Sequence, residues 1–233
     1  MDSPKTYRTL SSGSDVLAQG FMTRVYMWMM LGLAATGAMA YYTTTSAQLL
    51  SVLLSRGTFL VLFVAEIGIV FFLSARIAKL NPATASALFF VYAVLNGLTI
   101  APILLVYTSE SVSSAFFTTA AMFGAMSAYG TLTKRDLSGW GSFLGMGLIG
   151  LIAASLINIF VGNSKADLVI SIIGVFVFTG LTAFDTFKLR ALAREIGGDE
   201  EAGGRLAIMG ALTLYLDFIN MFIFLLRIFG KRR

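Results

Sequence analysis

The chain has 233 residues, of which 57% are hydrophobic and only 12% are charged, and its formal net charge is +5. Soluble domains carry about 25% charged residues, so this composition excludes an ordinary soluble enzyme and indicates a polytopic membrane protein. Cysteine and histidine are absent, which excludes disulfides, thiolate or imidazole metal sites and the usual pH switch of proteins. The basic residues lie in loops between apolar segments, so we expect the lipid bilayer, and no nucleic acid, as the partner.

The first 20 residues are polar and rich in serine. They predict a mobile cytoplasmic tail, residues 1–20, ahead of a single transmembrane domain, residues 21–233. Seven later segments are each close to the ~20 apolar residues that cross about 30 Å of hydrocarbon. The predicted fold class is therefore all-α, a polytopic membrane protein with seven transmembrane helices. The predicted spans are residues 24–43, 57–77, 84–107, 112–132, 142–161, 168–187 and 206–229.

Lysine and arginine are distributed unevenly among the loops. The N-terminal tail and every second loop carry most of them, whereas the alternate loops hold only Arg56 and Lys165. Cytoplasmic loops are enriched in these residues, so the N-terminus is predicted to lie in the cytoplasm, with the chain in the inner or plasma membrane. Seven spans then put the C-terminus outside, although Arg227 and residues 231–233 gather there. The alternative is a re-entrant last segment; the apolar length of residues 206–229 favours seven spans.

Two aspartates lie inside the last two predicted spans. Asp185 stands in GLTAFDTFKLR and Asp217 in GALTLYLDFINMFIFLLRIFG. A carboxylate at the centre of a membrane helix costs about 2.5–3.5 kcal/mol on insertion scales, so it should face a partner or a water-filled cavity. If the helices are straight and upright, Asp217 lies deeper than Asp185 by about 10 Å. Direct pairing then requires helix tilt, different helix boundaries or a bridging water.

Other polar residues of the spans recur at helical spacing, so that each set shares one face. The seventh span has Thr213, Asp217 and Asn220; the sixth has Thr179, Thr182, Asp185 and Thr186; the third has Tyr92, Asn96 and Thr99. Such faces can line a hydrophilic path through a bundle. The alternative is interhelical hydrogen bonding without transport, at about 0.6 kcal/mol for each bond. The two aspartates favour the path, lined by Asn220, Thr213, Thr182 and Asn96.

The second predicted span carries two more charged residues, Glu66 near its middle and Arg76 near its cytoplasmic end. An ion pair between Arg76 and Asp185 would offset the cost of both charges. The alternative for Arg76 is an interfacial arginine that extends its charge to the membrane surface. Glu66 is either part of a gate or a protonated packing residue.

The chain resembles the transmembrane Bax inhibitor motif family, and within it the bacterial branch. The likeness extends from about residue 21 to the C-terminus, and the motif around Asp217 is its most specific part. The motif around Asp185 resembles the sixth helix of that family. Further similar segments are NGLTIAPI, TTAAMFGAMSAYG and TKRDLSGWG.

This resemblance implies a seven-helix fold with the C-terminal helix at the centre of the bundle. It also implies a pH-sensitive calcium leak whose paired-aspartate sensor falls at Asp185 and Asp217, with Arg76 and Glu66 as the corresponding second-helix residues. Two carboxyl groups in one dry site cannot both ionise at low cost, so protonation can act as the gate. Calcium binds oxygen ligands, so Asp185 and Asp217 would form a weak, transient calcium site, with calcium as the permeant ion and no cofactor.

Three other classes of protein remain to be weighed. Intramembrane aspartyl proteases use two aspartates, but with a tyrosine before one of them and Gly-x-Gly before the other. Here Phe184 and Leu216 precede the aspartates, so we do not expect an enzyme. A retinal-type protein needs a lysine in its last helix, and residues 206–229 contain none. The main alternative is a non-conducting stress regulator that binds other membrane proteins.

Overall fold

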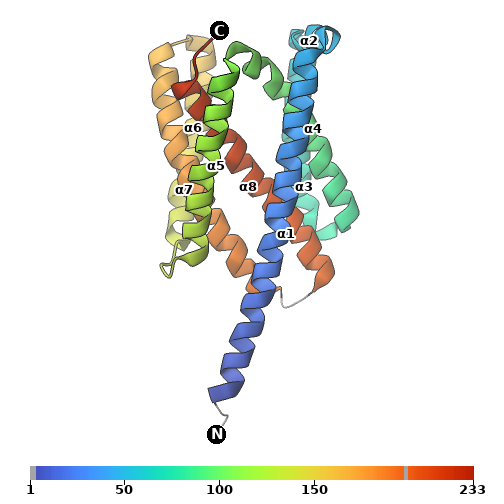
Figure 1. The fold of residues 1–233 in the computed structure, drawn as a ribbon, viewed down its shortest axis with the longest axis vertical. Helices are drawn as coiled ribbons and strands as arrows, with labels where there is room; N and C mark the ends of the chain where they lie inside the picture. Colours follow the sequence, from blue (N-terminus) through green and yellow to red (C-terminus); the bar gives the residue numbers. More distant parts are fainter. Residues whose placement is uncertain (1–3, 197–198) are drawn as a thin grey trace. The chain divides into compact units, whose positions relative to one another are not determined.

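The structure is a computed structural model, and it describes residues 4–196 and 199–233. Within these ranges the regular structure is helical (Figure 1). The helices are α1 (Pro4–Thr45), α2 (Ala47–Leu53), α3 (Arg56–Arg76), the 3-10 turn η1 (Ile77–Lys79), α4 (Pro82–Val106), α5 (Ser109–Leu132), α6 (Ser138–Val161), α7 (Ser164–Glu195) and α8 (Glu200–Phe229). The all-α class predicted from the sequence is confirmed.

Each of the seven predicted spans coincides with one long helix to within one residue at its C-terminal end or lies inside it, but the count of seven is only partly supported. Five helical segments of the described chain are long and apolar enough to cross a membrane: Gly57–Lys79, Pro82–Val106, Ser138–Val161, Ser164–Glu195 and Glu200–Phe229. The other two long helices, α1 and α5, are rich in threonine, serine and alanine, which lowers their hydropathy. Five spans are thus supported, and the seven-span count stays a prediction.

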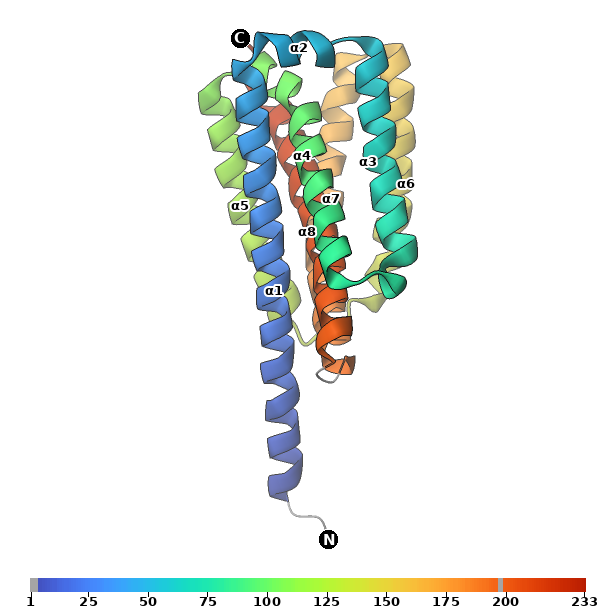
Figure 2. The same cartoon turned by 90° about the vertical axis from the view of Figure 1, so that its right-hand side faces the viewer.

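The N-terminal part of the chain adds two features to the expected arrangement. The helix α1 begins at Pro4, ahead of the first predicted span. Residues 1–3 lie outside the described residues, and the mobile cytoplasmic tail expected for residues 1–20 stays a prediction. A short helix, α2, also separates the first two spans, and Figure 2 shows it lying across the ends of α1 and α3. The hydroxyl of Ser46 caps α2, and that of Ser55 caps α3. Because serine side chains accept hydrogen bonds from free N–H groups, they begin new helices at these positions.

The chain divides into two compact units. Unit 1 comprises Met1–Ile103 and Leu189–Tyr215, and unit 2 comprises Leu104–Lys188 and Leu216–Arg233. Three helices, α4, α7 and α8, therefore contribute residues to both units. Of these, α8 is the most enclosed: 72% of its most apolar stretch is buried, compared with 11% for the corresponding stretches of α3 and α6.

The core of unit 1 is built around Tyr215 of α8. The ring of Tyr215 meets those of Phe89 and Tyr92 of α4 edge to face, with centroid distances of 5.8 and 5.7 Å. All three side chains are almost completely buried. On α1, Gly32 leaves the space that the Phe89 ring occupies, because a β-carbon there would lie 2.4–2.9 Å from ring atoms. Aromatic packing therefore joins α1, α4 and the first half of α8.

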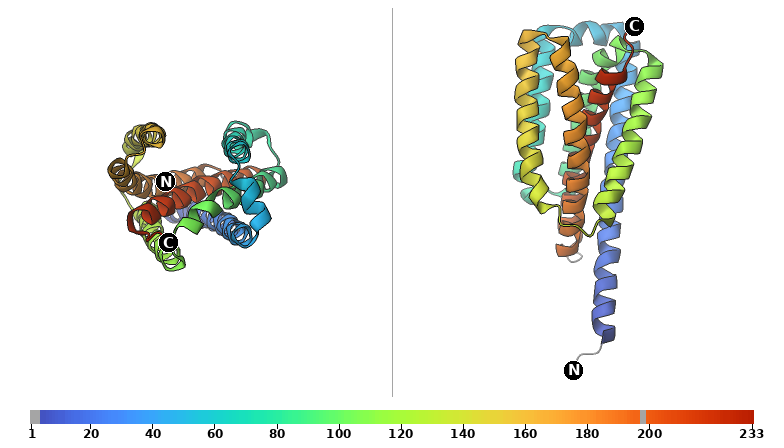
Figure 3. Two further views of the ribbon diagram at one scale, coloured as in Figure 1. Left: turned by 90° about the horizontal axis from the view of Figure 1, so that it is seen from above. Right: turned by 90° about the vertical axis from the view of Figure 1, so that its left-hand side faces the viewer.

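The core of unit 2 is contributed by α5, α6, α7 and the second half of α8, which lie side by side in Figure 3. Buried residues from three of these helices form its hydrophobic cluster: Leu144, Leu151, Ile170, Phe178, Leu181, Met221, Phe224 and Leu225. On the other side of α8, Phe218 packs against Phe116 and Phe123 of α5, with centroid distances of 5.6 Å in both cases. Both faces of this part of α8 are thus buried within unit 2.

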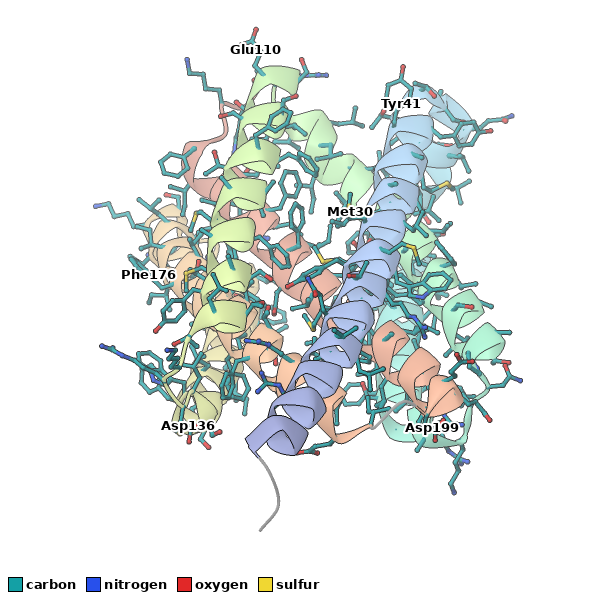
Figure 4. The ribbon with its side chains drawn as sticks, turned by 60° about the horizontal axis from the view of Figure 1, so that its bottom comes forward. Met30, Tyr41, Glu110, Asp136, Phe176 and Asp199 are labelled. Atoms are coloured by element: carbon teal, nitrogen blue, oxygen red, sulfur yellow. The ribbon has the colours of Figure 1, made fainter. Side chains whose placement is uncertain are left out.

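The C-terminal segment is attached to the start of α5. The N–H of Thr108 donates to the carbonyl of Lys231 at 3.0 Å, and the N–H of Arg233 donates to the carbonyl of Val106 at 2.9 Å. Figure 1 shows the C-terminus beside this end of α5, and Figure 4 shows Glu110 at this end and Asp136 beyond the opposite end of the helix. The C-terminus therefore lies at the Glu110 end of unit 2.

Candidate functional site

Asp185 of α7 and Asp217 of α8 lie together in unit 2, where a hydrogen bond joins their carboxyl groups. Asp217 is only 4% exposed, whereas Asp185 is half-buried. Both residues lie well inside their helices, because α7 continues to Glu195 and α8 begins at Glu200. The spans predicted from the sequence ended at 187 and began at 206. The longer helices of the structure reduce the difference in depth that was expected between the two aspartates.

The segment of α7 that carries Asp185 packs tightly against α5. The hydroxyl groups of Ser127 and Thr186 are hydrogen-bonded at 3.0 Å, and both side chains are buried. A β-carbon at Gly130 would overlap the backbone carbonyl of Ala183, so α5 and α7 approach as closely as glycine allows. This contact holds the segment of α7 that carries Asp185 against a fixed neighbour.

One oxygen of the pair has no hydrogen-bond partner within residues 4–196 and 199–233. The Oδ2 atom of Asp217 is buried and forms no hydrogen bond with the described residues, and the same holds for Oγ1 of Thr179 on α7. Buried polar atoms without partners are uncommon in native proteins, and each calls for an explanation such as strain, a catalytic role, or a bound water or ion. A hydrogen bond between two carboxyl groups requires a proton on at least one of them. Such a pair is chemically suited to hold a proton, and carboxyl oxygen atoms are the ligand type that hard cations prefer.

Three other residues that were predicted to line a path form hydrogen bonds within their own helices. The side chains of Thr182, Thr213 and Asn220 each donate to a backbone carbonyl four residues earlier, at 2.8, 3.1 and 2.8 Å. Such bonds satisfy a polar side chain without any partner on another helix. Thr182 is fully buried, whereas Thr213 and Asn220 are partly exposed.

A second buried acid, Glu66 of α3, lies in unit 1. Its Oε1 accepts a hydrogen bond from Thr99 at 2.8 Å, and its Oε2 accepts one from Asn96 at 3.5 Å. The Oδ1 of Asn96 in turn accepts a bond from the hydroxyl of Tyr215 at 3.0 Å, and that hydroxyl lies 2.6 Å from Oγ1 of Thr36. We call these five residues the Glu66 network; it joins α1, α3, α4 and α8.

The sequence indicated Glu66, Asn96 and Thr99 as polar residues of interest, but it gave no reason to select Thr36 or Tyr215. Tyr215 has a weak signal, since it stands two residues before Asp217 in an otherwise apolar stretch. Arg76, the predicted partner of Asp185, is exposed at the last residue of α3. Since Arg76 belongs to unit 1 and Asp185 to unit 2, their ion pair stays a prediction.

Comparison with known proteins identifies the family of the chain. Residues 18–233 match the model of the family described as inhibitor of apoptosis-promoting Bax1. The chain belongs to this family. The resemblance predicted from its helix motifs is thus confirmed, and with it a multi-pass helical membrane protein.

Bacterial members of the family are similar over nearly their whole length. The inner membrane protein YbhL of Escherichia coli K12 is 47% identical over 217 residues, which are 92% of this chain and 93% of that protein. An uncharacterized protein of Deinococcus radiodurans is 46% identical, covering 91% and 90% of the two chains. The uncharacterized protein RP147 of Rickettsia prowazekii is 41% identical, covering 100% and 99%.

Proposed function

We propose that this protein is a pH-sensitive calcium leak channel gated by protonation of Asp185 and Asp217. The observation that carries the proposal is the hydrogen bond between two carboxyl groups inside apolar helices. Burying these groups costs several kcal/mol, and packing alone does not require them. A pair that shares a proton responds to pH, and its oxygen atoms suit a hard cation.

Proton exchange with the pair takes place through Asp185. Asp185 is half-buried, and Lys188 is exposed three residues further along α7. Asp217 is almost fully buried. A proton that enters from the Lys188 end of unit 2 therefore reaches Asp185 first. Loss of that proton leaves an ionised Asp185, the form that the proposed ion pair with Arg76 would hold.

Calcium passes the pair without a permanent site. It takes about six to eight oxygen ligands, more than two carboxyl groups supply. The Nδ2 of Asn220 donates to its own helix, so its carbonyl oxygen is available as a further ligand one turn from Asp217. Weak binding of this kind suits conduction, because the ion must also leave.

The proposed topology has seven spans, a cytoplasmic N-terminus and the last helix at the centre of the bundle. The inner membrane location follows the name of the Escherichia coli relative. In support of a full last span, Arg227 forms a salt bridge of 3.2 Å with Asp167 at the start of α7. The C-terminus, the start of α5 and the start of α7 thus share one end of unit 2, as seven spans require. Asp167 also offsets one of the C-terminal charges that conflict with the positive-inside rule.

Purified protein in liposomes tests the proposal. Calcium flux should change with pH in the wild type, whereas Asp185→Asn and Asp217→Asn should flatten that pH response. Asparagine keeps the shape of the side chain and can still hydrogen-bond, so melting temperatures should stay close to wild type. Folded variants that retain both the flux and its pH dependence would refute gating by the aspartates.

A non-conducting regulator is the second candidate. It is favoured by the exposed apolar surface of α3, which includes Phe59, Phe63, Phe71 and Phe72 and faces either lipid or another membrane protein. Pure protein separates the two functions, since a regulator of this kind produces no calcium flux in liposomes at any pH.

A further inference from the structure

A pair of aromatic rings lies two helical turns from the aspartate pair. Phe178 precedes Asp185 on α7 by seven residues, and Phe224 follows Asp217 on α8 by seven residues. Residues seven apart share a face of a helix and lie about 10.5 Å apart along its axis. The two rings pack together, with centroids 6.0 Å apart and planes inclined by 30°. The same seam between α7 and α8 thus carries a pair of acids and then a pair of rings.

The rings are held closely. Phe178 is 5% exposed and Phe224 is 8% exposed, and both belong to the hydrophobic cluster of unit 2. Gly174 precedes Phe178 by one turn of α7, and a β-carbon at Gly174 would lie 2.6 Å from atoms of the Phe224 ring. Only glycine leaves room for the ring in this position. Phe224 therefore occupies the space that a side chain at position 174 would need.

Polar groups occur on both sides of the rings, but the rings themselves supply none. On the side of the acids, Oδ2 of Asp217 has no hydrogen-bond partner among the described residues. On the other side, the guanidinium of Arg227 lies 5.9 Å from the centroid of the Phe224 ring and binds Asp167. Along the seam, the rings are thus an apolar barrier between the acid pair and the charged end of unit 2.

We propose that Phe178 and Phe224 form a hydrophobic gate, which closes the ion path on the side of the aspartate pair that faces the C-terminal end of α8. The inference rests on the proposed function, because a gate presupposes a path. Hydrophobic constrictions stop ions because they exclude the water and oxygen ligands that an ion needs. Protonation of the acids controls access from one side, and the rings set the resting barrier on the other.

The test compares three variants in calcium-loaded liposomes. Phe224→Ala should raise the resting calcium leak several-fold while the pH response of the aspartates is retained. Phe224→Leu should restore a low leak, since leucine is apolar and fills much of the space. Phe218→Ala is the matched control: Phe218 is equally buried on the same helix, but it packs against α5 and lies off the seam. It should lose comparable stability without a change in leak.

The possible results separate the gate from the proposed function. If the wild type leaks calcium in a pH-dependent manner and Phe224→Ala leaks no faster, the gate is refuted and the channel stands. If Phe218→Ala and Phe224→Ala raise the leak equally, general loosening of unit 2 explains both, and the gate is again refuted. If Phe224→Ala conducts and the wild type does not at any pH, the gate is supported and the pH-sensitive leak fails. If no folded variant conducts, both proposals fail.

Discussion

The Glu66 network of unit 1 and the aspartate pair of unit 2 both place carboxyl groups inside apolar helices, but they differ in how fully these groups are bonded. Both oxygens of Glu66 accept hydrogen bonds, and the chain of bonds continues through Asn96 and Tyr215 to Thr36. Asp217 keeps one buried oxygen, Oδ2, that has no hydrogen-bond partner in the part of the chain that the structure describes. A satisfied network stabilises and specifies a core, whereas an incompletely bonded acid retains capacity for a proton or an ion. Under the proposed function, the comparison predicts a structural role for the Glu66 network and a functional role for the aspartate pair.

Removing the hydroxyl group at the centre of the Glu66 network should have the largest effect on stability. Tyr215→Phe keeps the aromatic packing but leaves Thr36 and Asn96 each without one hydrogen bond. We expect a loss of about 1–2 kcal/mol, because two interhelical bonds are lost in a buried site. Thermal unfolding in detergent measures the effect.

The exposed Tyr42 provides the control, since Tyr42→Phe should leave the melting temperature unchanged. The pH dependence of calcium flux should survive in Tyr215→Phe, because the aspartate pair is intact. Loss of that pH dependence with little loss of stability would reverse the comparison and make the Glu66 network the functional site.

Two threonines test the same difference between the Glu66 network and the aspartate pair, with a smaller expected effect on stability. Thr99 donates to Glu66 at 2.8 Å, whereas the buried Oγ1 of Thr179 has no partner among the described residues. Valine has nearly the same shape as threonine but lacks the hydroxyl group. Thr99→Val should therefore cost about 0.5–1 kcal/mol, and Thr179→Val should be neutral or stabilising. The two melting curves in the same detergent give the answer, and equal losses would show that the hydroxyl of Thr179 is bonded after all, by water or by an ion.

Periodicity and charge were sufficient to predict much of this structure. Apolar runs of about 20 residues located seven long helices, because the thickness of a bilayer fixes their length. The same reasoning missed α2, which is a single short helix begun by Ser46. Hydropathy also underestimated the lengths of α7 and α8. Both helices extend past their apolar stretches into polar residues, α7 to Glu195 and α8 from Glu200.

The candidate site was predictable in part. Asp185 and Asp217 were conspicuous because a charge in an apolar helix is costly, and that cost is visible in the sequence. Thr36 and Tyr215 were not conspicuous, since threonine and tyrosine are common in membrane helices. Their role depends on a bond between residues 179 positions apart, which local periodicity cannot reveal. Likewise, the match between Phe178 and Phe224 depends on the register of two antiparallel helices.

Asp136 is an acid outside the helices, and its substitution should have the smallest effect on stability of those considered. It is fully exposed between α5 and α6, and hydrogen bonds from Ser138 lower its pKa below the ordinary value of 3.8. Because its pKa is lower in the folded than in the unfolded protein, its contribution to stability is present above the unfolded pKa and is lost as the pH falls through the folded pKa. The difference in melting temperature between wild type and Asp136→Asn should thus be small and constant near neutral pH, and it should disappear in strong acid.

Calcium flux should keep its pH dependence in this variant, since Asp136 is already ionised throughout the neutral range. A shifted flux profile in Asp136→Asn would mean that an exposed acid takes part in sensing, and the contrast between the buried aspartate pair and the rest of the chain would no longer explain the pH response.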